Sequence, residues 1–242
     1  MAKITHKTII RKKRIGLRKS TKLKDFDKKS DPYYFNRRLK VLNEEISGMP
    51  KNISILDVGC GTGRFLKALN KKGYKNITGI DSTQQMLNQA RTQNKSKLIL
   101  GDLDKYDFGN KRFDLILFMD VLEHVTDPIK SLRKYQNLLT PKGKILITYP
   151  NPYLVPFFNL IGLLGLKINY KDNIIFLRKW IAKSDLKLNI TQSDAIILLT
   201  RVPTWTKKVF ERIEQSLPKT VVELFAFCKV LVLEKNSPIN SS

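Results

Sequence analysis

The sequence has few cysteines, few histidines and few acidic residues, and it lacks long apolar runs. Its two cysteines, Cys60 and Cys228, cannot form a disulfide scaffold and suit a reducing compartment. No apolar run reaches the roughly 18 residues that a membrane-spanning helix needs. No apolar segment follows the basic start, which argues against a secretory signal. We therefore expect a cytoplasmic protein, either free or peripheral to a membrane.

Basic residues outnumber acidic ones by 45 to 21, and the formal net charge of the 242-residue chain is +24. Half of this excess lies in residues 1–40, and no acid occurs between Lys3 and Lys24. Such a segment repels itself and has too few apolar residues to fold alone, so residues 1–30 are predicted to form a flexible tail. Two interpretations stay open. Residues 3–24 are an arm for nucleic acid or an anionic surface, or they are a solvated tail in a lysine-rich protein.

Apolar residues make up 42% of the chain, enough for a full hydrophobic core. From residue 33 onward, segments with helical spacing alternate with short runs rich in Ile and Leu. The expected helices are 33–47, 62–72, 83–93 and 127–139. The expected strands are 53–58, 77–80, 98–100, 113–118 and 144–149, the last after a turn at Pro141 and Gly143. This alternation predicts an α/β fold with a parallel sheet covered on both faces.

The last third of the chain is less regular. Residues 176–184 and 205–216 are predicted to be helical, and 186–191 and 227–233 to be strands. The apolar segment Tyr153–Leu166 is too short to span a bilayer. It is interpreted as a substrate lid, an interfacial segment or a buried helix.

A glycine-rich turn between the first strand and the next helix is the most informative motif. Gly59, Gly61 and Gly63 let the backbone turn sharply and approach a ligand, and free N–H groups at the helix start attract an anion. The nicotinamide fingerprint requires glycine at position 64, where this chain has Arg64. The Gly-Lys-Ser/Thr of a P-loop is also absent, so neither a dehydrogenase nor an NTPase fits.

Two acidic residues follow the next two strands. Asp81 lies 18 residues after Gly63, close to the spacing at which an acid takes ribose hydroxyls in nucleotide-binding folds. Asp102 can accept from an adenine amino group, while Leu103 and Met86 cover the ring. The glycine loop, Asp81 and the Gly-Asp-Leu at 101–103 fall at strand carboxyl ends, where open α/β sheets bind ligands.

The sequence from Asn52 to Asn151 resembles the class I S-adenosylmethionine-dependent methyltransferases, in the subgroup that includes ubiquinone-type methylases. Five motifs in order carry this resemblance: ILDVGCGTG at 55–63, GID at 79–81, GDL at 101–103, FDLILFMDVLEHV at 113–125 and LLTPKGKILITYPN at 138–151. The resemblance implies a Rossmann-like, mostly parallel sheet of seven strands with helices on both faces and a C-terminal antiparallel strand. It also implies one domain over 31–242, with 151–222 as the variable region on the substrate side.

The resemblance assigns roles to particular residues. The three loop glycines would line the methionine part of S-adenosylmethionine, with Asp57 beneath them and Asp81 holding the ribose. Asp102 and Leu103 would flank the adenine. The positions expected to face cofactor and substrate are Asp120 and Val121. One residue of the preceding helix, Tyr34, Arg37 or Arg38, is expected to cover the cofactor.

Methyl transfer from a sulfonium to an O, N, S or C nucleophile depends mainly on positioning the two reactants. His124 is the best candidate for a general base, because the other histidine, His6, lies in the tail. A structural role for His124 is an equal alternative. Some relatives bind a divalent metal with an acid-x-x-Glu-His cluster, but the further histidine ligand has no counterpart after His124, and we expect no metal.

Three hypotheses about function remain open at this point. The first is a methyltransferase acting on an O, N or C nucleophile of a small-molecule or lipid-like acceptor. The second is an RNA or protein methyltransferase that docks through the basic arm. The third is a binding module without catalysis. The segment from Pro150 to Tyr153 partly matches the Asn-Pro-Pro-Tyr box of nucleic-acid amino methylases, but it follows the wrong strand and lacks one proline, so we discount it.

Overall fold

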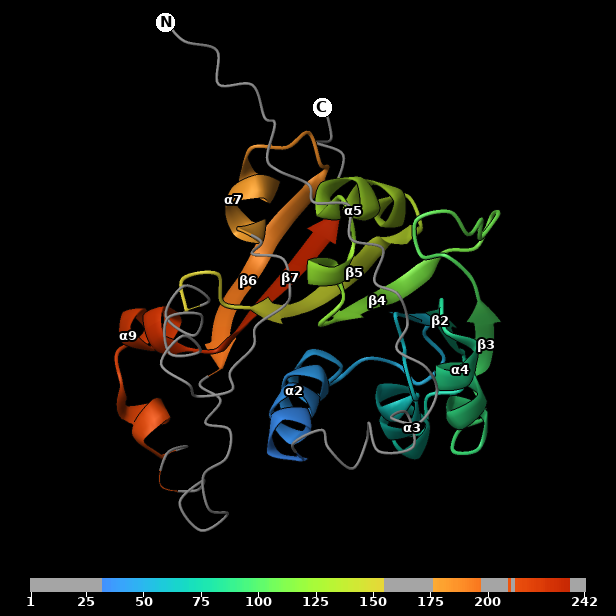
Figure 1. Cartoon of the computed structure of the whole chain (residues 1–242), viewed down its shortest axis with the longest axis horizontal. Coiled ribbons are helices and arrows are strands. Elements are labelled where there is room, and N and C mark those ends of the chain that lie inside the picture. The colour runs from blue at the N-terminus through green and yellow to red at the C-terminus, as the bar shows by residue number, and fades with distance from the viewer. Residues whose placement is uncertain (1–31, 155–175, 197–208, 210–211, 236–242) are drawn as a thin grey trace, which may run out of the picture.

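The computed structural model describes residues 32–154, 176–196, 209 and 212–235 (Figure 1). The basic segment 1–30 predicted as a tail lies outside the described residues, as do most of Tyr153–Leu166 and half of the helix expected at 205–216. The described residues of that helix, 209 and 212–216, are helical.

Seven strands form one sheet in the order β3-β2-β1-β4-β5-β7-β6. Strands β1 to β5 pair in parallel, whereas β7 runs antiparallel to both of its neighbours. This confirms the predicted Rossmann-like fold, including its late antiparallel strand. The strands are β1 (Ile55–Val58), β2 (Ile77–Asp81), β3 (Lys97–Leu100), β4 (Phe113–Met119), β5 (Leu139–Pro150), β6 (Leu188–Ile196) and β7 (Cys228–Lys235).

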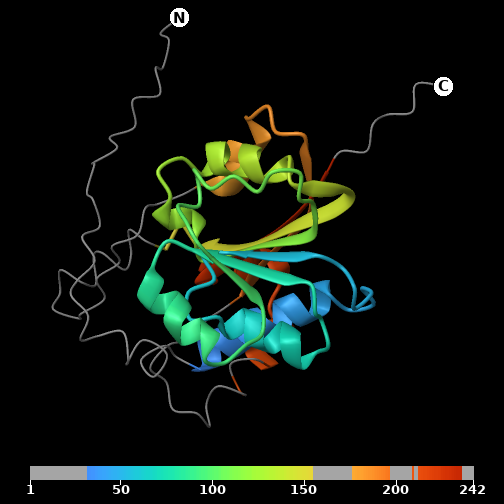
Figure 2. The same ribbon diagram turned by 90° about the vertical axis from the view of Figure 1, so that its right-hand side faces the viewer.

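Helices cover both faces of the sheet, with α5 and α7 on one side and α2, α3 and α4 on the other (Figure 2). The short helix α9 packs beside β6 at the end of the sheet. The helices are α2 (Pro32–Glu45), α3 (Arg64–Lys71), α4 (Gln84–Arg91), the 3₁₀ turn η1 (Leu122–His124), α5 (Pro128–Gln136), α7 (Leu177–Ala182) and α9 (Lys219–Phe225). No helix in the described ranges is long and apolar enough to cross a membrane.

Two hydrophobic clusters, one on each face, hold these layers together. Tyr135 and Leu132 of α5 pack with Phe118 on one face. Leu42 of α2 and Leu66 of α3 pack with Leu117 on the other. Alternate residues of β4 therefore feed opposite cores, as expected for a central strand buried on both sides.

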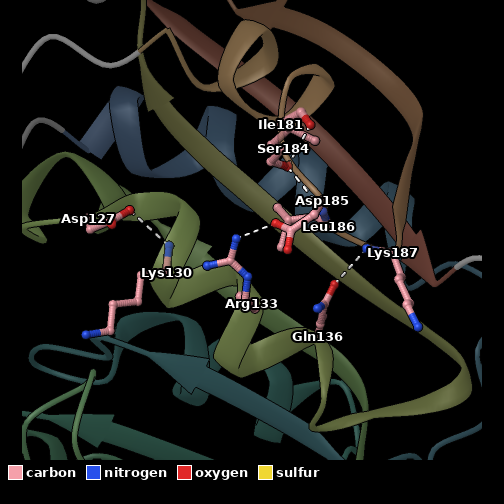
Figure 3. Close-up of polar contacts among 9 residues, drawn as sticks. All are labelled: Asp127, Lys130, Arg133, Gln136, Ile181, Ser184, Asp185, Leu186 and Lys187. Carbon is pink, nitrogen blue, oxygen red and sulfur yellow. Dashed lines mark hydrogen bonds and ion pairs between the residues drawn. The ribbon is translucent and has the colours of Figure 1, made fainter. Parts of the chain in front are cut away.

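Polar contacts fasten α5 to the turn that leads into β6 (Figure 3). Asp127 caps the helix by accepting from the Lys130 amide at 3.0 Å. Arg133 forms an ion pair with Asp185, and Gln136 accepts from the Lys187 amide at 3.0 Å. These contacts join the parallel half of the sheet to its C-terminal strands.

Two predicted boundaries are wrong in an informative way. The expected turn at Pro141 and Gly143 lies inside β5, which begins at Leu139. The register against β4 shifts between Phe113 and Leu115, and this irregularity accommodates the proline and glycine within the strand. The helix expected to reach residue 139 ends at Gln136, because the chain enters this longer strand.

Candidate functional site

The glycine loop lies at the carboxyl end of β1. Gly59, Gly61 and Gly63 have φ values of 68°, 53° and 79°, in the left-handed region that favours glycine. A Cβ at Gly59 would lie 2.7 Å from a methyl carbon of Val121. A Cβ at Gly61, in contrast, would meet no atom within 4 Å in the described part of the chain. The loop is thus packed tightly against Val121 at Gly59, whereas the space beside Gly61 is free of described atoms.

Asp81 holds this loop from the end of the neighbouring strand. Its carboxylate accepts from the Gly61 amide at 2.8 Å and from the Thr83 amide at 2.8 Å. A carboxylate has about four lone-pair positions, so two remain for hydroxyl donors such as those of a ribose. The Asp81 side chain is largely buried, so its carboxylate has a fixed orientation and these two lone pairs have fixed directions.

Asp57 lies beneath the loop on β1, opposite Gly79 of β2. It is 1% exposed, and its Oδ2 has no hydrogen-bond partner among the described residues. Burial, followed by the nearby charge of Asp81, raises the pKa of the Asp57 carboxyl to about 8. Two buried carboxyl groups on adjacent strands, one of them with an oxygen that has no hydrogen-bond partner among the described residues, suit a cationic ligand.

The loop after β3 contains the residues expected around an adenine. Asp102 is exposed and accepts from the Asp104 amide at 2.9 Å, and Lys105 lies 3.8 Å from it. Leu103 is half-buried against the core. Met86 is half-buried on α4.

Two residues of α5 fix that loop in place. The carbonyl of Leu103 accepts from the Lys134 ammonium and from the Tyr135 hydroxyl, each at 2.9 Å. Lys134 also donates to the Tyr106 carbonyl at 2.6 Å. Sequence reasoning missed Lys134. Its place one turn after the buried Ser131 offers only a weak signal.

Asp120, at the end of β4, has a φ of 60° and is the one non-glycine residue with positive φ in the described ranges. Its carboxylate accepts from Tyr34 and Arg38 of α2 at 2.5 Å each, and from the Thr148 hydroxyl of β5 at 2.8 Å. Burial, and then the charge of Asp120, raise the pKa of the Tyr34 hydroxyl well above its ordinary value. Tyr34 is therefore a hydrogen-bond donor here.

The same network explains the two neighbouring arginines of α2. The Arg38 guanidinium lies 4.0 Å from the centre of the Tyr34 ring and is nearly buried. Arg37 instead forms an ion pair with Glu214, in a different part of the fold. Of the two arginines predicted as alternatives, Arg38 reaches the site edge. The four-residue spacing of Tyr34, Arg38 and Leu42 could have indicated a buried face for Arg38.

Val121 and His124 follow Asp120 on the η1 turn. Val121 is buried against Gly59, so it backs the glycine loop. His124 is exposed, and its amide donates to the Val121 carbonyl at 2.9 Å. No three His, Cys, Asp or Glu side chains in the part described are placed to hold a metal ion.

Asn151, from the discounted amino-methylase box, has a structural role. Its buried side-chain amide donates to the carbonyls of Glu223, Leu224 and Ala226 at the end of α9, at 2.7 to 3.3 Å. An amide with its donors occupied in this way is poorly suited to recognise a nucleobase, which supports the decision to discount the box.

Comparison with known proteins defines the class of this site. Residues 56–147 match the methyltransferase domain family. The chain is 31% identical over 119 residues to a ubiquinone biosynthesis O-methyltransferase of Coxiella burnetii and 32% identical over 124 residues to that of Histophilus somni. These matches cover 47% of this chain and 50% and 51% of the relatives, so the chain spans about half the length of the curated relatives it matches.

Solved structures agree at the level of the fold. A plantazolicin methyltransferase in complex with a pentazolic desmethylPZN analog and SAH has a TM-score of 0.60 and 17% identity, and the match covers 88% of this chain and 89% of that one. The magnesium protoporphyrin IX methyltransferase of Synechocystis, with bound SAH, has a TM-score of 0.57 and 14% identity over 84% and 83% of the chains. The matched segment and the fold together make residues 56–147 a class I S-adenosylmethionine-dependent methyltransferase domain. This confirms the family predicted from the five motifs.

Proposed function

We propose that the chain transfers the methyl group of S-adenosylmethionine to a nucleophilic atom of a small-molecule or lipid-like acceptor. The observation that carries this proposal is the pairing of Asp57 and Asp81 on adjacent strands beside a left-handed glycine loop. The names of the curated relatives, which are ubiquinone biosynthesis O-methyltransferases, support a low-molecular-weight acceptor.

The residues present fit this cofactor. When bound, it supplies a methyl group on a positively charged sulfur. Gly61 leaves room for the methionine part, and Asp57 places an unpartnered carboxylate beneath it. We assign the two remaining lone-pair positions of Asp81 to the ribose hydroxyls. The adenine is assigned to the neighbourhood of Asp102, Leu103 and Met86.

Asp120 contributes by position rather than by contact with the methyl group. Three donors already surround its carboxylate, from α2 and β5. We propose that it fixes Tyr34 over the site edge and directs the following residues, including Val121, against the glycine loop. Its left-handed backbone supports this role, since such conformations persist where the surroundings over-determine them.

His124 remains our candidate general base, since it is exposed on the turn that follows this edge.

Residues 151–222 are proposed as the substrate side of a single domain over 31–242. We also retain the proposal of a cytoplasmic location.

Transfer of a labelled methyl group tests the acceptor class. The full chain is incubated with methyl-labelled S-adenosylmethionine and, separately, with a metabolite extract, total RNA and a protein extract. We expect label in the low-mass metabolite fraction. Label confined to RNA or protein would contradict the acceptor class, and no transfer in any fraction would contradict the activity.

Replacing His124 by glutamine tests the base. General-base catalysis typically contributes about 10²–10⁴-fold, so H124Q should lower kcat within that range for a hydroxyl acceptor. The acidic limb of the pH–rate profile should disappear as well. Unchanged turnover with an unchanged profile would leave His124 a structural role.

A further inference from the structure

The connections that lead into the five parallel strands carry an unusual set of charges. Residues 46–54, 72–76, 92–96 and 109–112 lie directly before β1, β2, β3 and β4, and residues 137–144 span the start of β5. None of these five stretches contains an acid, although Asp102, Asp104 and Asp107 lie earlier in the connection between β3 and β4. Because the strands are parallel, these connections meet at one edge of the sheet, opposite the glycine loop. We call the exposed cations there the amino-edge row: Lys51, Lys72, Lys75, Lys95, Lys97, Lys111, Arg112 and Lys142.

Acids gather instead at the carboxyl edge. Asp57 and Asp81 lie at the ends of β1 and β2, and the connections after β3 and β4 add Asp102, Asp120 and Asp127. The two edges of one sheet therefore carry opposite charge. A basic composition alone would spread lysines over both edges, so it does not account for this segregation.

The few acids near the amino edge are already engaged. Glu45 and Glu234 both lie 3.1 Å from Lys144. Asp114 accepts from Ser54 and Thr140. Asp185, in the turn before β6, pairs with Arg133 (Figure 3). None of them forms an ion pair with the amino-edge row.

The cations of the row, in contrast, have no ion pair with any described acid. The neighbouring Lys97 lowers the pKa of Lys111, so positive charge is close to positive charge within the row. The arrangement is that expected of a surface that meets a polyanion.

We propose that the amino-edge row docks the phosphate backbone of a nucleic-acid duplex, as a tether and not as the methyl acceptor. The row follows five adjacent strands, so its length is about 20 Å at roughly 4.8 Å per strand. That length matches about six successive phosphates of one duplex strand. A narrow line of point charges fits a rod-shaped polyanion better than a flat bilayer.

The chemistry of the row also favours backbone contacts over base recognition. Seven of its eight cations are lysines, which act as point charges on phosphate, and bidentate base contacts are made mostly by arginine. Tyr74 is the single aromatic residue in these five connections and is buried, so no ring is offered for stacking on single strands. With the acidic carboxyl edge turned away from the phosphates, the duplex does not reach the methyl-transfer site.

Two matched triple variants of the full chain test the proposal. K75Q/K95Q/K111Q removes three charges from the row. K130Q/K179Q/K219Q removes three exposed lysines elsewhere, so both variants keep the same net charge. Binding to a fluorescent DNA duplex is measured over a range of salt concentrations. Each lost phosphate contact removes about 0.9 from the slope of log affinity against log salt, so the row variant should lose up to about 2.7. Its affinity at moderate salt should fall by about tenfold or more, whereas the control variant should resemble the wild type.

Several results would overturn the proposal. Equal weakening of both variants would assign binding to total charge or to residues 3–24. Absence of duplex binding by the wild type would remove the site. Loss of binding by the row variant to phosphatidylglycerol vesicles, with duplex binding intact, would make the partner a membrane. S-adenosylmethionine titration of both variants serves as the folding control. The titration does not depend on duplex binding. A failure of the proposed S-adenosylmethionine site can therefore be told apart from a failure of the proposed duplex contact.

Discussion

Asp57 combines features that a residue with a purely structural role does not need. It is buried at the end of β1, faces a second carboxylate across the strand pair, and leaves one oxygen without a partner among the described residues. Such a group destabilises the fold when it is ionised and gains stability when it is protonated or meets a cation. The residue is therefore best explained by a positively charged ligand above it.

The protonation of Asp57 predicts how stability depends on pH. Its pKa is about 8 in the folded chain, against about 3.9 for an unfolded aspartate. Between these values the folded state holds a proton that the unfolded state has lost. The free energy of unfolding should therefore fall as pH rises from about 4 to about 8. D57N should flatten this dependence in urea unfolding experiments.

The same residue links cofactor binding to protons. A cationic ligand favours the ionised carboxylate, so the affinity for S-adenosylmethionine should rise with pH up to about 8. Calorimetry in two buffers of different ionisation enthalpy should show proton release on binding below that pH. An affinity independent of pH in the wild type would separate Asp57 from the ligand.

Gly61 and Gly109 form a matched pair for testing the loop. Both have positive φ, at 53° and 59°, and a Cβ at either would meet nothing within 4 Å in the described residues. An alanine at each position should therefore cost a similar backbone strain of about 1 kcal/mol. G61A should abolish S-adenosylmethionine binding, whereas G109A should bind as the wild type does. Equal binding by both variants would move the ligand away from the loop.

At the scale of elements, α2 is attached to the carboxyl edge of the sheet through one carboxylate. Tyr34 and Arg38 reach Asp120 from one face of the helix, and Leu42 of the same face packs into the core. The side chains of Arg38 and Asp120 are 10% and 19% exposed. The ion pair is thus mostly shielded from water. For a buried pair, removing one partner lowers the free energy of unfolding more than removing both.

A pair of variants measures this attachment. R38M leaves the Asp120 carboxylate without its cation and should lower the free energy of unfolding by about 3 kcal/mol. R38M/D120N removes the uncompensated charge, and asparagine tolerates the left-handed backbone, so part of the loss should be regained. Chemical denaturation provides the measurement. A double variant less stable than R38M would show that the ion pair is not what holds the helix.

The elements themselves were largely predictable from the sequence. Hydrophobic runs such as Phe113–Phe118 and the glycine loop gave the strands and their order, because local spacing reflects burial. The extension of β5 through Pro141 was not predictable, since it depends on a register shift against β4. The interactions of Asp120 and Asn151 were missed for a similar reason. The α2 partners of Asp120 lie 82 to 86 residues away, and the partners of Asn151 lie 72 to 75 residues away, beyond any local pattern.

On the scale of the whole molecule, the two functions that we propose lie at opposite edges of the parallel part of the sheet. The carboxyl edge gathers acids around the glycine loop, and the amino edge gathers unpaired lysines. The parallel pairing of β1 to β5 makes this separation possible, because the carboxyl ends of these five strands all lie at one edge of the sheet. A cationic cofactor and a polyanionic tether can then bind one domain without competing.

Calorimetric titration of the full chain with S-adenosylmethionine, its demethylated product and NAD tests the central claim most directly. We predict that the first two bind at one site per chain, that NAD does not bind, and that D81N, which replaces the carboxylate that holds Gly61, loses binding of both. No heat from S-adenosylmethionine at millimolar concentration, or equal binding by D81N, would contradict the assignment of this site.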